Sequence, residues 1–151
     1  MSSRLVLSSW VRDVKRVIKE VVKLEKLVPG GQAIGDLIDG RKVFVWGALP
    51  GETALVRLTK LKKTHAEAIV TEVIKPSPDR IVPRDDCFLA TSPWQIMTKS
   101  AEGRHKAALV KEAFRQHRVE IEPNEIVSDG QYYHYRNKME YSLWWDHQTE
   151  R

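Results

Sequence analysis

Short runs in which apolar residues alternate with polar ones fill the first half of the chain, and this two-residue period predicts β-strands. In one run Ala54, Val56 and Leu58 fall on one face, and the residues between them fall on the other. Similar runs extend from Lys42 to Trp46 and from Ala66 to Ile74. The pattern therefore predicts a first half that is rich in β-structure.

Glycine and proline separate these runs. Pro29-Gly30-Gly31 ends the first strand, Asp39-Gly40 predicts a hairpin turn, and Leu49-Pro50-Gly51 ends a further strand. Pro76-Ser77-Pro78 ends the last one. Five short strands within about 60 residues, with no long helix between them, are typical of a closed or nearly closed barrel, which leaves no strand edge exposed.

The residues before the barrel follow a different period. Between positions 8 and 20 apolar residues recur at helical spacings, as at Val11, Val14 and Ile18. From Glu20 onward the spacing becomes that of a strand. We expect residues 1–16 to form a basic extension that is helical in part, and residues 17–77 to form the barrel.

The second half predicts a helix followed by strands. Ser92-Pro93-Trp94-Gln95 is typical of a helix start, because serine can cap, proline suits the first helical position and glutamine completes a capping box. We expect this helix over residues 93–118. Strands are expected at Glu120–Ile126 and Tyr132–Trp145, around a turn at Asp129-Gly130. The fold class predicted for the chain is α+β, with β-structure dominant.

The aromatic-rich last strand has no predicted neighbour in the sequence that follows it. Tyr141, Leu143 and Trp145 alternate with other residues, and the chain stops at Arg151 without a closing element. We therefore expect residues 78–151 to be part of a domain that is truncated at position 151. An uncovered strand of this kind is also an edge for association, so a homodimer formed through it is one hypothesis for the partner.

Composition and hydropathy bear on the cellular location of the protein. No apolar run approaches the roughly 18 residues that a membrane span requires, and the stretch from Met1 to Leu7 is too short for a secretory signal. The single cysteine, Cys87, permits neither an internal disulfide nor a metal site built from cysteines. We expect Cys87 to be a small buried residue, and the protein to be cytoplasmic without membrane contact.

The net charge of +5 is unevenly distributed along the chain. Residues 1–26 carry seven Lys/Arg against three Asp/Glu, and residues 41–63 carry six against one, whereas residues 85–151 carry nine against eleven. A basic front suits a polyanion, because cations near phosphates release condensed counterions. A well-solvated surface without a nucleic-acid partner would show the same distribution.

Several blocks of the sequence resemble a known family. Pro29-Gly30-Gly31, Gly47-Ala48-Leu49-Pro50-Gly51-Glu52, the basic loop at 60–63 and Pro76-Ser77-Pro78-Asp79-Arg80 occur in this order. They resemble the TRAM domain at the front of RNA uracil-5-methyltransferases, a small OB-like β-barrel that holds RNA and does no chemistry. Tyr135-Arg136-Asn137-Lys138-Met139-Glu140-Tyr141-Ser142 resembles a strand of the central domain that follows this barrel in the same family.

The resemblance implies a function and also limits it. It implies an RNA-binding module for tRNA or rRNA, without catalysis by this chain alone and without a cofactor of its own. S-adenosylmethionine and the catalytic cysteine belong to a family domain beyond the equivalent of residue 151. Many relatives hold an iron–sulfur cluster with four cysteines, and one cysteine does not suffice for it. The alternative is that the chain is a fragment of an active methyltransferase.

The candidate RNA contacts are cations and one aromatic residue. On the barrel they are Arg41, Lys42, Trp46, Arg57, Lys60, Lys62 and Lys63, and on the tail they are Arg136 and Lys138. Flexible lysines suit phosphates, and a tryptophan on a strand face suits base stacking. A solvated lysine turn, a core position for Trp46 and structural pairing of the tail cations remain alternatives. Phe44, on the same strand face as Trp46, is expected in the core.

Overall fold

A computed structural model describes residues 17–135 together with Lys138, Glu140 and Trp145. Most of the helix expected between positions 8 and 20 lies outside these residues. Its last part is wrong, because strand β1 (Lys19–Leu27) already begins at Lys19. Pairing with another strand explains the difference: the Ile18 carbonyl accepts a hydrogen bond of 2.9 Å from the Leu58 N–H. The sheet thus satisfies backbone groups that a helix would otherwise have paired.

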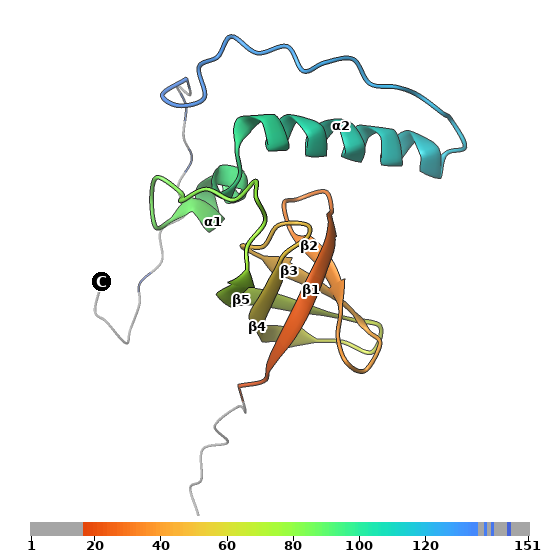
Figure 1. The fold of residues 1–151 in the computed structure, drawn as a ribbon, viewed down its shortest axis with the longest axis vertical. Helices are drawn as coiled ribbons and strands as arrows, with labels where there is room; N and C mark the ends of the chain where they lie inside the picture. Colours follow the sequence, from red (N-terminus) through yellow and green to blue (C-terminus); the bar gives the residue numbers. More distant parts are fainter. Residues whose placement is uncertain (1–16, 136–137, 139, 141–144, 146–151) are drawn as a thin grey trace, which may run out of the picture.

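Five strands close into a barrel. They are β1, β2 (Ala33–Asp36), β3 (Lys42–Trp46), β4 (Thr53–Leu61) and β5 (His65–Lys75). Around the barrel they follow the order β1-β2-β3-β5-β4, and β4 pairs with β1 to close it (Figure 1). All neighbours are antiparallel except β3 and β5, which are parallel. The predicted five-stranded barrel and the α+β class are confirmed.

Small and β-branched side chains fill the barrel. The buried positions of its strands include Val22, Leu24, Val43, Val45, Ala54, Val56, Ala66 and Ala68. β1 and β2 come so close together that a Cβ atom at Gly35 would lie 2.4 Å from the carbonyl oxygen of Lys23. Glycine is therefore required at position 35, where the pairing of β1 with β2 is interrupted by a bulge.

The helix expected over residues 93–118 is interrupted near its start. The structure has a short helix α1 (Phe88–Thr91), a 3₁₀ turn η1 (Pro93–Ile96) and a long helix α2 (Lys99–Gln116). Thr98 caps α2 by accepting a hydrogen bond of 3.3 Å from the Ala101 N–H, whereas Ser92 makes no capping hydrogen bond. The separation arises because Met97 is extended and forms an isolated β-bridge with Arg80.

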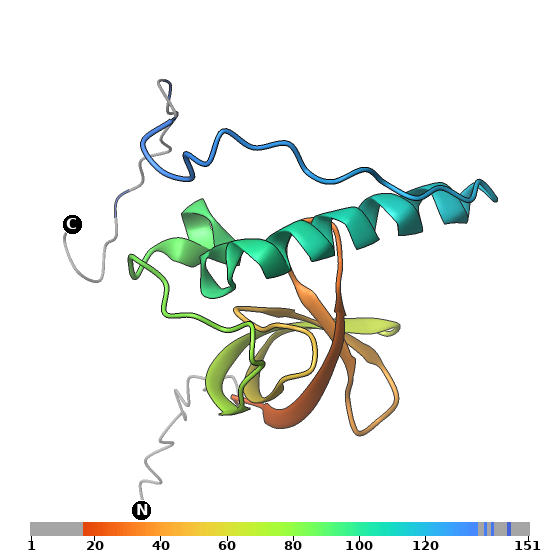
Figure 2. The same cartoon turned by 45° about the horizontal axis from the view of Figure 1, so that its top comes forward.

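The segment before α2 shares the hydrophobic core of the barrel. Ile96, Met97 and Ala101 are buried in the same cluster as the inward residues of the strands. A Cβ atom at Gly31, which has a φ of +100°, would lie 3.0 Å from the indole nitrogen of Trp94, so the turn after β1 packs tightly on η1. α2 lies across one end of the barrel and extends beyond it (Figure 2).

Residues 119–135 run back along α2 without forming a strand (Figures 1 and 2). The predicted strand Glu120–Ile126 is therefore wrong, and so is the part of the last strand at 132–135. An extended segment needs a paired neighbour to form a sheet, and this segment contacts a helix instead, through an ion pair between Lys111 and Glu122. Residues 136–137, 139, 141–144 and 146–151 lie outside the description.

In the part that is described, no helix combines the length and the apolarity that crossing a bilayer demands.

Candidate nucleic-acid interface

The outer face of the barrel brings together two of the predicted contact residues. Trp46 on β3 lies directly opposite Ile69 on β5, and Ile69 lies opposite Arg57 on β4. Arg57 in turn lies opposite Lys19 at the start of β1. Directly opposed residues point to the same side of a sheet. Trp46, Ile69, Arg57 and Lys19 therefore form a row across four strands, which we call the Trp46 row.

The expected core position of Phe44 is wrong. Val43 and Val45 are the buried residues of β3, so alternation places Phe44 and Trp46 on the outer face. Both aromatic side chains are half-buried, and Phe44 packs edge-to-face against His65 with ring centroids 5.7 Å apart. The narrow interior accepts valine and alanine, and the larger aromatic rings lie on the outer face.

The predicted loop cations meet at one end of the barrel. The β2–β3 loop supplies Arg41, and the β4–β5 turn supplies Lys62 and Lys63. One guanidinium nitrogen of Arg41 donates a hydrogen bond of 2.9 Å to the Lys62 carbonyl, and the Lys62 N–H donates one of 2.9 Å to the His65 carbonyl. Arg41 thus holds the two loops together, and we call this end, formed by residues 38–41 and 60–65, the basic tip.

Carboxylates pair with some of these cations. Arg41 donates a hydrogen bond of 2.9 Å from Nε to Asp39, and this bond holds the pKa of the Asp39 carboxyl below its usual value. The Lys42 ammonium lies 2.8 Å from Asp36, and that hydrogen bond raises the pKa of Lys42. Arg41 and Lys42 are therefore partly neutralised.

Lys60 also has an acidic neighbour, since its ammonium lies 3.4 Å from Glu67. Among residues 17–135, the side chains of Lys19, Arg57, Lys62 and Lys63 have no carboxylate within 4.0 Å. All four are exposed. These four cations are available to a phosphate without breaking an existing ion pair.

The tail cations are not shown to join this surface. Arg136 lies outside the described residues. Lys138 is exposed, and its ammonium lies 2.9 Å from Glu140 of the same segment. Their role in RNA contact stays a prediction.

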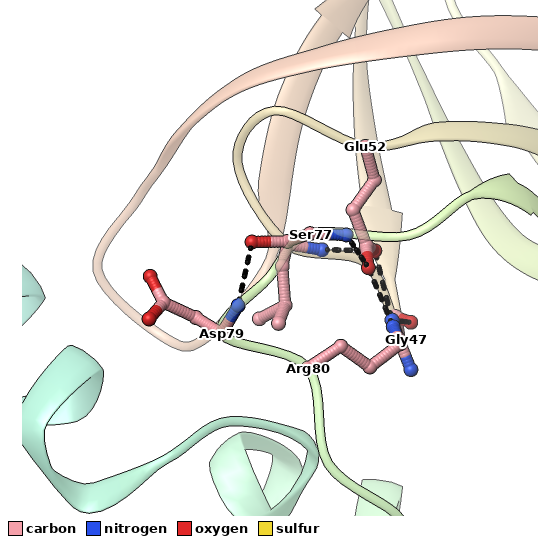
Figure 3. A network of polar contacts seen from close by, with 6 residues as sticks. Gly47, Glu52, Ser77, Asp79 and Arg80 are labelled. Carbon is pink, nitrogen blue, oxygen red and sulfur yellow. Dashed lines mark hydrogen bonds and ion pairs between the residues drawn. The ribbon is translucent and has the colours of Figure 1, made fainter.

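Two of the sequence blocks that suggested the family meet in a buried ion pair. Glu52 is fully buried at the turn before β4, and Arg80 follows β5 (Figure 3). Arg80 donates to the Glu52 carboxylate from Nε at 2.5 Å and from Nη2 at 2.8 Å, and Nη2 also donates to the Gly47 carbonyl at 2.8 Å. The backbone N–H groups of Leu49 and Ser77 donate to the same carboxylate at 2.8 and 3.1 Å.

This network has a structural role that the sequence analysis missed. Burial alone would raise the pKa of Glu52, but the hydrogen bonds from Arg80, Leu49 and Ser77 outweigh it and hold the pKa below its usual value. Glu52 is therefore ionised at neutral pH. The signal was present in the sequence, because Glu52 and Arg80 each end one of the two blocks.

Cys87 is exposed, so the expected burial of this residue is wrong. It lies just before α1 in a turn, where its carbonyl accepts a hydrogen bond of 2.9 Å from the Ala90 N–H. Within the described ranges, no three His, Cys, Asp or Glu side chains are grouped closely enough to hold a metal ion.

Comparisons with known proteins agree with the barrel. Residues 16–71 match the family model described as the TRAM domain. An uncharacterized RNA methyltransferase of Thermotoga maritima is 29% identical over 124 residues, which are 81% of this chain and 28% of that protein. One of Gloeobacter violaceus is 31% identical, again over 81% of this chain and 28% of the relative. A 23S rRNA (uracil(1939)-C(5))-methyltransferase of Dichelobacter nodosus is 53% identical over 47 residues, 31% of this chain and 11% of that protein.

The barrel and these matches agree, because the residues that match the TRAM domain include four of the five strands and most of the fifth. Residues 16–71 thus resemble a TRAM domain, most of the chain is similar to proteins named RNA methyltransferases, and a shorter stretch is similar to one named a 23S rRNA uracil-C5 methyltransferase. The chain spans about 28% of the length of the first of these relatives.

Proposed function

We propose that this chain is an RNA-binding module of a 5-methyluridine RNA methyltransferase-like protein, and that it binds tRNA or rRNA through the outer face and the basic tip of its barrel. The observation that carries the proposal is a set of exposed cations that have no carboxylate partner among residues 17–135. They are Lys62 and Lys63 at the basic tip, and Arg57 and Lys19 in the same row as the half-buried Trp46. The TRAM match and the names of the relatives support RNA as the polyanion.

In this proposal some cations contact the RNA phosphates, and Arg41 holds the turn that carries them in place. Lys62 and Lys63 project from a tight turn and are the first candidates for phosphate contact, because flexible ammonium groups follow a backbone without a fixed geometry. Arg41 positions that turn through its hydrogen bond to the Lys62 carbonyl. Lys42 and Lys60 contribute less, because each would exchange a carboxylate for a phosphate.

Methyl transfer belongs, in this proposal, to the part of the relatives' length that this chain does not span. S-adenosylmethionine would be held there, and these residues would hold no cofactor of their own. An iron–sulfur cluster is not proposed, because it needs about four thiolates and the sequence has one cysteine. The whole protein would act on uridine in tRNA or rRNA in the cytoplasm.

Fluorescence anisotropy of a labelled RNA hairpin, titrated with the protein between 50 and 200 mM salt, tests the proposal. With several phosphate contacts, affinity falls by orders of magnitude over this range. Lys62→Ala combined with Lys63→Ala should reduce the slope of log affinity against log salt by about 1.4 to 1.8, because two contacts are lost. Lys75→Ala is the matched control, since it removes an exposed charge at the far end of β5.

Two results would overturn the proposal. One is the absence of binding at 50 mM salt. The other is a loss of log affinity in the Lys62/Lys63 variant no greater than twice the loss in the Lys75 control, which would mean that net charge alone matters, because the variant removes two charges and the control removes one.

A second candidate function is docking to a protein, including a second copy of the chain. Val110 and Phe114 on α2, and Tyr135 and Trp145 in the tail, are exposed large apolar residues. Exposed apolar surface of this kind favours association. Sedimentation velocity at 1 M salt distinguishes the two functions, because apolar dimerisation survives a salt concentration that abolishes electrostatic RNA binding.

A further inference from the structure

The side chains of the Trp46 row differ in type from those of the basic tip. Moving across the barrel surface, it presents an aromatic ring, an aliphatic side chain and then two cations, one residue from each of β3, β5, β4 and β1. Neighbouring strands lie about 4.8 Å apart. Trp46 and Arg57 are therefore separated by about 10 Å along the surface, and Lys19 lies about 5 Å farther.

This arrangement has the two features that an unpaired nucleotide requires. Trp46 and Ile69 are half-buried on the outer face and offer an apolar surface on which a base can stack. Arg57 and Lys19 are exposed, long and free of carboxylates within the described residues, so their charged ends can reach the phosphates on either side of that base. The sheet fixes the spacing between the stacking residue and the cations.

We infer that the Trp46 row is a subsite for a single-stranded segment of RNA, with one base stacked on Trp46 and the adjoining phosphates at Arg57 and Lys19. The inference rests on the proposed RNA-binding function and adds selectivity to it. The basic tip offers lysines that contact phosphates, and phosphates are present in duplex and single strand alike, so the tip does not distinguish the two. A base within a duplex is already stacked on its neighbours and cannot lie on Trp46, so the row favours unpaired RNA.

Lys19 was not among the residues that the sequence pointed to. It lies 38 positions before Arg57 in the chain, and only the pairing of β1 with β4 places the two side by side. The same pairing closes the barrel. β1, the strand that closes the barrel, thus holds Lys19 beside Arg57 in the Trp46 row.

The experiment compares a labelled, unstructured oligouridine with a duplex RNA of equal length. Trp46→Ala should weaken binding of the oligouridine by about 5- to 150-fold, the loss of one base stack, and leave its salt slope unchanged. Binding of the duplex should change less than about 2-fold. Trp46→Phe keeps a ring and should retain most of the affinity for the oligouridine.

The double variant Lys19→Ala/Arg57→Ala tests the cationic half of the row and replaces only exposed side chains, so it also serves if Trp46→Ala fails to fold. Its salt slope for the oligouridine should fall by about 1.4, the value for two contacts to a single strand. If the Trp46 and Lys19/Arg57 variants weaken both RNAs equally, or neither, while wild-type binding stays salt-dependent, the subsite is refuted and the proposed function stands. Absence of salt-dependent RNA binding by the wild type overturns both.

Discussion

Replacing Arg80 by methionine should destabilise the barrel more than any loss of a surface ion pair. Methionine keeps much of the aliphatic volume and removes three hydrogen bonds, two to the Glu52 carboxylate and one to the Gly47 carbonyl. Glu52 is fully buried, and it would be left with only the N–H groups of Leu49 and Ser77 as donors. An ionised carboxylate in that position is a buried charge without a partner.

The magnitude follows from the burial of the two groups. Breaking a buried ion pair by removing one partner costs about 3–5 kcal/mol. The Arg80 side chain keeps 20% of its surface exposed, so the lower end of the range, about 3 kcal/mol, applies. With a urea m-value of about 2 kcal/mol per molar, the midpoint of unfolding should fall by about 1.5 M.

Arg104→Met is the matched control. Arg104 also makes two hydrogen bonds to one carboxylate, at 2.8 and 2.9 Å to Asp79, but its side chain is 58% exposed. Exposed pairs contribute less than about 1 kcal/mol. Urea unfolding monitored by tryptophan fluorescence should therefore show a midpoint shift in Arg104→Met that is at most a third of the shift in Arg80→Met.

The pH dependence of the stability loss in Arg80→Met gives a second test of the buried ion pair. The pKa of Glu52 is lowered in the folded state, so its contribution is present at neutral pH and is lost as the pH falls below its unfolded value of about 4.5. In Arg80→Met the carboxyl is no longer held ionised, and protonation relieves the buried charge. The difference between wild type and variant should thus shrink from pH 7 to pH 4. Equal shifts for the Arg80 and Arg104 variants, or a difference independent of pH, would refute the reasoning.

Two further predictions concern packing and titration. Gly35→Ala should lower the melting temperature by several degrees, because its Cβ would lie 2.4 Å from a backbone oxygen. Gly103 lies within α2, and the nearest atom to its Cβ would be 4.0 Å away in the Ile126 side chain, so Gly103→Ala should stabilise by about 0.5–1 kcal/mol. Calorimetry of both variants checks this, and equal shifts would contradict it. Burial lowers the pKa of His105 below 6.5, and Arg104 lowers it further while Asp79 opposes this. Stability should therefore decline as the pH falls through about 6.5, since the unfolded chain binds the proton more readily. In His105→Gln the midpoint of urea unfolding should change less between pH 7 and 5.5 than in the wild type. An unaltered decline in that variant would exclude His105 as its source.

The sequence was sufficient to predict the barrel because two local signals agreed with each other. Alternation marked the strands, as at β3, whose predicted and observed bounds coincide at Lys42 and Trp46. The turns fell at glycines that adopt positive φ, including Gly40 at +83° and Gly51 at +82°. Strand period and turn chemistry are both properties of neighbouring residues, so tertiary structure was not needed to recognise them.

The second half could not be predicted in the same way, because tertiary contacts decide its local structure. Serine is a common helix cap, which is why a helix was expected to begin after Ser92. The bridge between Met97 and Arg80 keeps the chain extended there, and α2 begins only after its cap residue Thr98. Residues 120–126 have the composition of a strand and find a helix as their neighbour. In both segments the contact partner lies outside the window that a pattern covers.

The candidate site was predictable in residue type but not in pairing. Composition indicated the cations of 41–63, yet only the three-dimensional structure shows that Asp36 partly neutralises Lys42. It also shows that Arg57 lies beside Lys19, with no carboxylate partner among residues 17–135. Alternation placed Phe44 and Trp46 on one face of the strand but did not show which face points inward, so the expectation of a core position for Phe44 was wrong. The small volume of the closed barrel decides it in favour of Val43 and Val45.

The most direct test of RNA binding by the barrel is a map of the contacted surface on the isotopically labelled protein. Backbone amide shifts in a ¹⁵N–¹H NMR titration with an unstructured RNA oligonucleotide would show which residues it contacts. The largest changes should cluster at 41–46, 57–65, Ile69 and Lys19, on the outer face of β1, β3, β4 and β5 and at the basic tip. Changes confined to α2 and residues 119–135, with the barrel unaffected, would contradict it.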